Sequence, residues 1–443
     1  MPTMYKKLLI LSLILSDVHG FGTFIGNTKT KPSSSVTEPA TIEGFPDVYT
    51  EARQMIDIST LMYALPEVRD LARENEFENS EAFLQEPIAV RDFVGLMKEN
   101  IDVIRGISKF NPDEDPFQKL VVDSFKDIVE RNAENEAATI VEINDEEKDK
   151  ELVYAVVVDP SMERITVAFR GTNTIKDGLV DASAWLKRAK NPMRRLDENQ
   201  PRNLEYHAGF YRYLFDPNEL TEAELSSFEA TDNMSLDYKE GDEISKFDEI
   251  LNFHLLPTLK KYPGYKVYIS GHSLGAALAT EFAFQVAAID CPEIPKPVTC
   301  VSVASPYVGD RDFRKAFKLA ERKNLIRHLR VGNHRDIVTL SFFISIRFNP
   351  FDDDKKLKLG KLYKHVGVNL KLFEDGMHEF NYPIDDIFTE LKHAWGNCFF
   401  SNLIANISDH GTQVYSERLE KNKAQLEGLQ LDDLYDAYFK EDI

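Results

Sequence analysis

The sequence predicts an α/β fold in which a mostly parallel central sheet is flanked by helices. Short runs of aliphatic and β-branched residues alternate along the chain with longer segments of helical periodicity. Strands that alternate with helices form a sheet that is covered on both faces. One such strand is followed directly by a glycine-flanked serine and then by a helix. Composition agrees with this class, because a chain of 443 residues with 43% hydrophobic residues can bury a sizeable core.

The N-terminal part is expected to lie outside the folded domain. Two lysines precede the apolar run Leu8 to Leu15, and Val18-His19-Gly20 offers a cleavage point, so residues 1–20 have the layout of a signal peptide. Residues 21–46 are interpreted as a flexible linker or a transit-like segment, because their first part lacks acidic residues and is rich in Ser, Thr and Lys. The layout resembles bipartite targeting to plastids. The expected location is therefore the secretory pathway, secreted or in an endomembrane lumen, with the plastid as the alternative.

Residues 47–443 are expected to form one domain, and residues 47–150 its helical N-terminal part. Apolar residues in that part recur at steps of three and four, as on one face of a helix. From Leu152 the period changes to that of strands. The predicted strands are residues 153–158, 165–169, 265–269, 298–304 and 325–331, with a helix at 276–288.

The charge balance restricts the partners. Lys and Arg number 53 against 74 Asp and Glu, so a net charge of −21 disfavours nucleic acid and strongly anionic membranes. Residues 216–249 hold twelve Asp or Glu against two Lys and are expected to form a solvated acidic insert. The insert lacks the ligand spacing of an EF-hand, so calcium binding is not favoured. The cysteines Cys291, Cys300 and Cys398 are too few for a disulfide scaffold. The sequence does not decide whether Cys291 and Cys300 form a disulfide.

The motif with the most chemical content is Gly271-His272-Ser273-Leu274-Gly275, which separates a predicted strand from a predicted helix. A serine on such a sharp turn presents its hydroxyl, and the flanking glycines remove side chains that would collide with nearby backbone. The N–H group of Leu274 lies at a helix start, where it can donate to an oxyanion formed at the serine. Ser273 is therefore the predicted nucleophile, and Leu274 is a predicted oxyanion-hole donor.

A nucleophilic serine needs a base that takes its proton and an acid that orients the base. In hydrolases with this strand–serine–helix motif the chain order is serine, acid, histidine. Asp336 follows the predicted strand 325–331 and is the preferred acid, while Asp310, after the preceding strand, is the runner-up. His410 is the preferred general base, because it lies late in the chain in a loop before a helix. Three other histidines follow Asp336. His365 is expected on a strand face, His378 in a polar loop and His393 in a helix.

Several segments in this order resemble the class 3 lipases, the fungal triacylglycerol-lipase-like family of α/β hydrolases. The likeness covers about residues 152–418 and rests on Phe169-Arg170-Gly171-Thr172, His207-Ala208-Gly209-Phe210, Pro306-Tyr307-Val308-Gly309-Asp310, Asn333 to Val338, and Asp409-His410 with Tyr415. The resemblance implies an α/β-hydrolase fold in which Asp336 and His410 complete the triad, and a structural role for Asp310. It also implies that Thr172 supplies a backbone N–H and a hydroxyl to the oxyanion, and that Asp181 orients that hydroxyl.

One departure concerns the segment after the oxyanion loop. Where the family often has tryptophan in Asp-Trp-Leu-x-Asp, this chain has Asp177-Gly178-Leu179-Val180-Asp181. The segment from Asn173 to about Lys190 is interpreted as a mobile amphipathic lid, because apolar residues precede a basic end. An ordinary surface helix is the alternative.

The predicted function is that of a serine ester hydrolase that cleaves acyl esters of glycerolipids, either triacylglycerol or a polar glycerolipid, through an acyl-enzyme. No metal or organic cofactor is expected. The expected partner is a lipid substrate at an interface, with transient contact to a membrane or lipid droplet. Nucleic acid is not an expected partner, and the sequence does not predict the oligomeric state. The alternative is a non-catalytic lipase-like binding or scaffold protein, because function lies in sites rather than in folds.

Overall fold

The computed structural model describes residues 44–74, 77–107, 122–128, 137–145, 152–171, 186–219, 243–336, 338–340, 344–347, 358–383 and 409–440. Pro46–Ile443 forms one compact unit, which is the unit described below. The predicted signal peptide and most of the predicted linker lie outside the described residues, so the leader, linker and single-domain assignments stay predictions.

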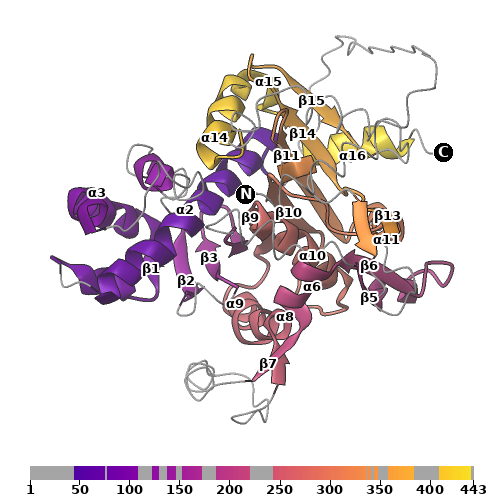
Figure 1. The fold of residues 1–443 in the computed structure, drawn as a ribbon, viewed down its shortest axis with the longest axis horizontal. Coiled ribbons are helices and arrows are strands. Elements are labelled where there is room, and N and C mark those ends of the chain that lie inside the picture. The colour runs from indigo at the N-terminus through magenta and orange to yellow at the C-terminus, as the bar shows by residue number, and fades with distance from the viewer. Residues whose placement is uncertain are drawn as a thin grey trace. The chain divides into compact units, whose positions relative to one another are not determined.

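The centre of this unit is a nine-stranded sheet with the order β1-β2-β3-β4-β9-β10-β11-β14-β15 (Figure 1). Its five inner neighbours, from β4 to β14, pair in parallel, and the pairs outside them are antiparallel. The strands are β1 (Ile88–Ala89), β2 (Thr139–Asn144), β3 (Tyr154–Asp159), β4 (Arg164–Phe169), β9 (Lys266–His272), β10 (Val298–Val303), β11 (Ile326–Asn333), β14 (Val368–Leu372) and β15 (His378–Asn381). The predicted α/β class and its parallel central strands are confirmed.

Helices cover both faces of the sheet. Along β9, Val267 and Ile269 point into a core that includes α10 residues, while the alternate residues Tyr268 and Ser270 face α2. The longer helices are α2 (Val48–Glu74), α3 (Val90–Ile107), α6 (Ala208–Phe215), α10 (Leu274–Ala288), α11 (Arg311–Arg322), α14 (Thr412–Lys421) and α16 (Leu431–Lys440). Shorter ones are η1 (Ser80–Leu84), α8 (Lys246–Glu249), η3 (Ile250–Leu255), α9 (Leu256–Lys261), η4 (Val338–Leu340) and α15 (Lys423–Leu426).

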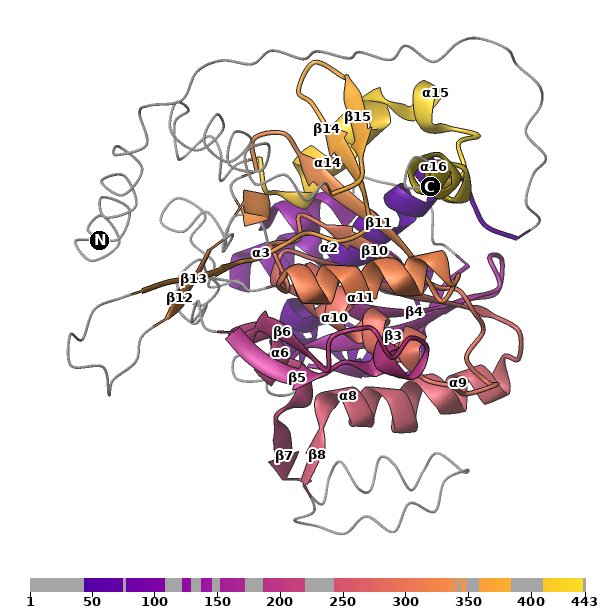
Figure 2. The same cartoon turned by 90° about the vertical axis from the view of Figure 1, so that its right-hand side faces the viewer.

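Small hairpins extend from these layers (Figure 2). They are β5 (Leu186–Lys190) with β6 (Asn203–His207), separated by η2 (Pro192–Arg195), β7 (Pro217–Glu219) with β8 (Glu243–Ser245), and β12 (Ile344–Arg347) with β13 (Lys358–Leu362). The ends of the predicted acidic insert thus pair as β7 and β8, and residues 220–242 between them lie outside the described part of the chain.

Three local predictions are wrong. The part predicted as helical also contributes β1 and β2, and a register shift between Ile140 and Glu142 breaks the alternation that would have revealed β2. His378 starts strand β15, because it pairs with Leu372 of the neighbouring strand and not because of its local sequence. His365 lies before β14 rather than on a strand, with its ring stacked on Tyr307.

Helix α2 is almost wholly enclosed, with 22 of its 27 residues buried. Its polar side chains therefore need partners inside the protein. Ser59 faces Ser270 of β9 at 3.5 Å between hydroxyl oxygens, and one turn later Tyr63 lies 2.8 Å from the ring of His272. Four residues of helix and two of strand both advance by roughly 6 Å, so the two elements stay in step. The helix is thereby fixed in register with the strand that carries the serine motif.

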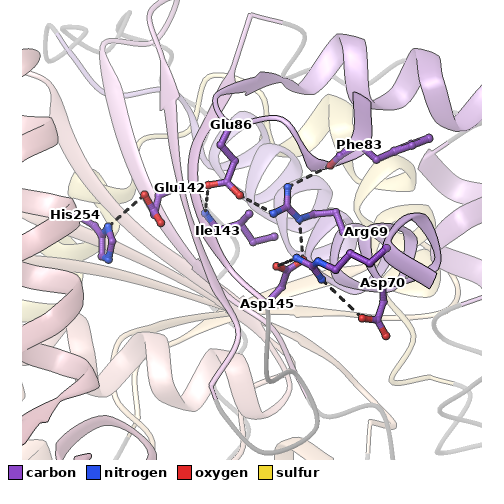
Figure 3. Close-up of polar contacts among 9 residues, drawn as sticks. Arg69, Asp70, Phe83, Glu86, Glu142, Ile143, Asp145 and His254 are labelled. Carbon is purple, nitrogen blue, oxygen red and sulfur yellow. Dashed lines mark hydrogen bonds and ion pairs between the residues drawn. The ribbon is translucent and has the colours of Figure 1, made fainter. Parts of the chain in front are cut away.

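The far end of α2 is held by a buried ionic cluster (Figure 3). Asp145, at the end of β2, accepts hydrogen bonds from Arg69 Nε at 2.8 Å and from Arg73 at 2.6 Å. Arg69 also donates to Glu86 at 2.6 Å and to the carbonyl of Phe83 at 3.2 Å. Asp145 and Arg69 are 1% and 5% exposed, so their attraction is little screened by water.

We expect Asp145→Asn to lower the free energy of unfolding by about 2–3 kcal/mol, because it removes the more deeply buried of the two carboxylates that pair with Arg69. Denaturant titration measures the loss. Asp70→Asn is the matched control: its pair with Arg73 is 3.7 Å apart and about one third exposed on each side, so its effect should stay within about 1 kcal/mol. Equal effects of the two substitutions would show that burial does not set the strength of the cluster.

A second buried acidic side chain has no such hydrogen-bond partner among the described residues. Glu281 of α10 is fully buried, and neither of its carboxyl oxygens has a hydrogen-bond partner among the described residues. Burial therefore raises the pKa of Glu281 well above the ordinary value of 4.5, so the folded protein retains a proton that the unfolded chain loses. Stability consequently falls as the pH rises from 4.5 toward the raised pKa.

We expect Glu281→Met to raise the free energy of unfolding by about 1–3 kcal/mol at pH 8, because it removes an unsatisfied buried carboxyl while keeping its volume. The gain should be smaller at pH 4.5, where the carboxyl of the unfolded wild type is still half protonated and less stability has been lost. Urea unfolding at the two pH values measures this difference. A gain that is the same at both would show that Glu281 is not the titrating group.

Candidate active site

The predicted nucleophile lies on a strained turn. Strand β9 ends at His272, helix α10 begins at Leu274, and Ser273 between them has φ 59° and ψ −124°. Few residues other than glycine adopt a positive φ, and such strain often accompanies function. The motif glycines are required by close contact: a Cβ on Gly271 would lie 2.3 Å from the carbonyl oxygen of Gly275, and one on Gly275 would lie 2.4 Å from that of Phe169.

The predicted acid and base are in contact. Asp336 follows β11, and its Oδ2 lies 2.9 Å from Nδ1 of His410, the residue two positions before α14. The same oxygen accepts a hydrogen bond from the Tyr415 hydroxyl at 2.7 Å, and Oδ1 accepts one from the N–H of Val338 at 2.8 Å. Both side chains are completely buried. A carboxylate can only accept, so Nδ1 of His410 carries the proton and, in the neutral ring, Nε2 is left able to take another.

The structure brings this pair to the turn that carries the serine. The ring of His272, which directly precedes Ser273, lies with its Nε2 2.7 Å from the carbonyl oxygen of His410. The two imidazole rings are 4.5 Å apart between centroids. Because β9 and β11 run in parallel with β10 between them, their carboxyl ends meet at one edge of the sheet. Residues from three distant parts of the chain therefore meet at that edge.

Further polar contacts hold the histidine segment in place. The side chain of Asn333 donates to the carbonyl oxygen of Asp409 at 2.8 Å, and the backbone N–H of Asn333 donates to the Tyr415 hydroxyl at 2.9 Å. Arg418 donates to the carboxylate of Asp409 at 2.8 Å. Sequence reasoning assigned no role to Asn333 or Arg418. Nothing in the local sequence identifies these two residues as part of the site. They contribute through hydrogen bonds to the segment around His410, and these bonds form only in the folded protein.

The oxyanion side of the site is described in part. Leu274 opens α10, whose first N–H groups have no intrahelical partner and can donate to an anion. Thr172, Asp181 and most of the predicted lid lie outside the described residues, and the described end of that lid, Leu186–Lys190, is strand β5 rather than helix. Arg170, before Thr172, is paired with Glu67 of α2 at 3.3 Å.

The runner-up acid has a structural place. Asp310 caps the N-terminus of α11, where its carboxylate accepts hydrogen bonds from the N–H groups of Asp312 and Phe313, each at 3.0 Å. Cys291 and Cys300 are free thiols rather than a disulfide, and Cys398 lies outside the described residues. Within the described ranges, His, Cys, Asp and Glu side chains form no group suited to a metal ion. None of the helices in those ranges is both long and apolar enough to span a bilayer.

Comparisons with known proteins agree with the motifs. Residues 166–345 match the family model "Lipase (class 3)". The chain is 28% identical over 231 residues to "Galactolipase DONGLE, chloroplastic" of Arabidopsis thaliana, covering 49% of this chain and 44% of that one. It is 43% identical over 90 residues to "Phospholipase A1-IIgamma" of the same plant, covering 18% of this chain and 21% of the other.

The chain thus spans less than half the length of these relatives. Among solved structures, lipase II from Rhizopus niveus matches with 16% identity and a TM-score of 0.42, over 82% of this chain and 92% of that one. The sheet order and the strand–serine–helix turn are those of an α/β hydrolase. Residues 166–345 are therefore similar to the class 3 lipase family.

Proposed function

We propose that the protein is a serine ester hydrolase that cleaves acyl esters of glycerolipids. The observation that carries this proposal is the 2.9 Å contact between Nδ1 of His410 and Oδ2 of Asp336, at the sheet edge where Ser273 occupies its strained turn. A buried carboxylate that fixes the tautomer of a histidine is what a weakly nucleophilic serine needs in order to react.

In the proposed reaction, Nε2 of His410 removes the proton of Ser273 Oγ while that oxygen attacks the ester carbonyl carbon. The negative charge that develops on the carbonyl oxygen is stabilised by the N–H groups of Leu274 and Thr172, with Asp181 orienting the threonine hydroxyl. Collapse of this intermediate breaks the ester bond, and the imidazolium gives its proton to the departing alcohol. Water, deprotonated by the same histidine, then releases the fatty acid. Asp336 holds the ring and stabilises its charged form.

We propose a polar glycerolipid at a lipid–water interface as the substrate. The relatives in sequence are named as a galactolipase and a phospholipase A1, and both names describe enzymes that act on polar acyl lipids. The segment predicted as a lid would cover the acyl-binding side of the site until a lipid surface is met. For the route to that lipid, secretion and plastid import remain the two proposals. N-terminal sequencing of the native protein separates them: a start near Phe21 indicates secretion, and one well past Val36 indicates the plastid.

The test uses the purified full chain with vesicles of phosphatidylcholine, of monogalactosyldiacylglycerol, or emulsified trioleoylglycerol, and measures fatty acid release. We expect release from at least one polar lipid and its loss after treatment with a fluorophosphonate. Mass spectrometry of the treated protein should locate the label on the peptide that contains Ser273. If no lipid is cleaved and no label is incorporated, the protein is a non-catalytic lipase-like binding protein.

A further inference from the structure

Helix α2 contacts the residue before the candidate nucleophile through Tyr63. The hydroxyl of Tyr63 lies 2.8 Å from Nδ1 of His272, and the other ring nitrogen of His272 lies 2.7 Å from the carbonyl oxygen of His410. Tyr63 also packs edge-on against the imidazole, with 5.6 Å between centroids and 71° between planes. All three side chains are buried. An unbroken series of contacts therefore joins the N-terminal helix to the backbone of the proposed base.

The chemistry of the partners fixes the direction of the hydrogen bonds. A carbonyl oxygen only accepts, so Nε2 of His272 must carry the proton that it shares with His410. In the neutral ring Nδ1 is then an acceptor, and the Tyr63 hydroxyl donates to it. Burial and the neighbouring His410 lower the pKa of His272 well below its ordinary value, and burial raises that of Tyr63. Both side chains therefore stay neutral near neutral pH, and the direction of the two hydrogen bonds does not change there.

The same hydroxyl also touches the segment that leads to Thr172. An ideal Cβ on Gly171 would lie only 2.1 Å from the Tyr63 oxygen and 2.7 Å from the carbonyl oxygen of His272, so only glycine fits between them. One turn further along α2, Glu67 pairs with Arg170. Tyr63 is therefore located where the oxyanion segment, the serine turn and the histidine loop meet.

We propose that Tyr63 and His272 are positioning residues of the hydrolase, which hold the main chain of His410 so that its ring stays aligned with Ser273. The inference rests on the proposed function. Asp336 holds the ring of His410 at Nδ1. The bond from His272 to the carbonyl oxygen of His410 fixes the backbone end of the same residue. Two fixed points together orient Nε2, and a misplacement of about 1 Å in such a group can lower the rate roughly 10²-fold.

The first experiment is Tyr63→Phe, which keeps the ring and removes only the hydroxyl. We expect kcat for a soluble short-chain nitrophenyl ester to fall by about 10-fold or more with KM unchanged, since substrate binding is not touched. Rates are referred to the number of active sites titrated by a fluorophosphonate, so partial unfolding does not enter. Tyr154→Phe is the matched control. Tyr154 lies on strand β3, and its hydroxyl is also buried and also donates a hydrogen bond, to Glu249 at 2.8 Å. It should leave kcat within about twofold. An unchanged kcat in Tyr63→Phe overturns the proposal.

A second pair of variants decides the matter if Tyr63→Phe does not fold. His272→Phe removes the donor to His410, whereas His272→Gln keeps an amide N–H that can reach the same carbonyl. We expect the glutamine variant to retain at least about 10-fold more kcat than the phenylalanine variant. Equal rates of the two His272 variants contradict the role of the donor. If the wild type itself neither cleaves the ester nor reacts with the fluorophosphonate, the proposed function fails, and this proposal with it. If the wild type is active and the variants are as active as the wild type, only the positioning role of Tyr63 and His272 is refuted, and the proposed function stands.

Discussion

Ser273→Ala is expected to lower ester turnover by about 10⁴- to 10⁶-fold and to abolish labelling by a fluorophosphonate. Alanine retains the Cβ that the turn already accommodates at φ 59°, so the loss would come from the missing Oγ and not from a changed backbone. The remaining rate would come from binding and from the oxyanion donors, which the substitution leaves in place. Turnover is measured with a short-chain nitrophenyl ester, and labelling by the mass of the intact protein.

Ser270→Ala is the control for this substitution. Ser270 lies three residues earlier on the same strand, is equally shielded from solvent, and donates to the carbonyl of Val301 at 2.9 Å. Its loss removes the bond to Val301 and the contact with Ser59 but no proposed catalytic group, so labelling should persist. Labelling that survives in Ser273→Ala rules out this serine as the nucleophile, whatever happens to the turnover.

Asp336→Asn should lower kcat by about 10⁴-fold, because the amide matches the carboxylate in shape but has no charge to stabilise the imidazolium. The substituted side chain can also turn its NH₂ toward His410, which selects the tautomer that cannot accept the serine proton. The measurement is kcat on the same ester, with circular dichroism to establish that the variant is folded.

Asp310→Asn tests the competing acid. Asparagine is as good a helix cap as aspartate, so the contact with the first N–H groups of α11 survives. Turnover should remain within a few-fold of the wild type. A collapse of kcat in Asp310→Asn together with an active Asp336→Asn would exchange the roles of the two carboxylates.

The elements with strong local signals could be predicted from the sequence. Runs such as Tyr154–Asp159 and Val298–Val303 are buried on both faces and read as strands without tertiary information. The serine turn is also a local pattern, because its glycines are demanded by contacts within the strand–turn–helix unit and with the adjoining strand β4. The places of Asp336 and His410 could be predicted for a related reason: each lies in a loop beside the sheet edge to which the parallel strands lead.

The missing parts depend on distant partners. Strand β2 carries a register shift that hides its period, and β15 exists only through its pairing with β14. Tyr63 lies in an ordinary helical sequence, and its role emerges only when α2 is placed across β9, more than two hundred residues further along the chain. No pattern within a window of a few turns contains that information.

The enclosure of α2 has a consequence for how the protein is made. The helix is synthesised early, yet the groups that surround it come late: Val48 donates to the carbonyl of Leu429, and Glu51 pairs with Arg327. Elements that follow soon in the chain, such as η1 and α3, also pack against this helix, but its contacts with α14 and Leu429 can form only when nearly the whole polypeptide has left the ribosome. Contacts between such distant positions slow folding and lengthen the time for which sticky surface is open to aggregation. A chaperone that retains the nascent chain would therefore raise the yield of this protein more than that of one whose helices pack only on neighbours in the sequence.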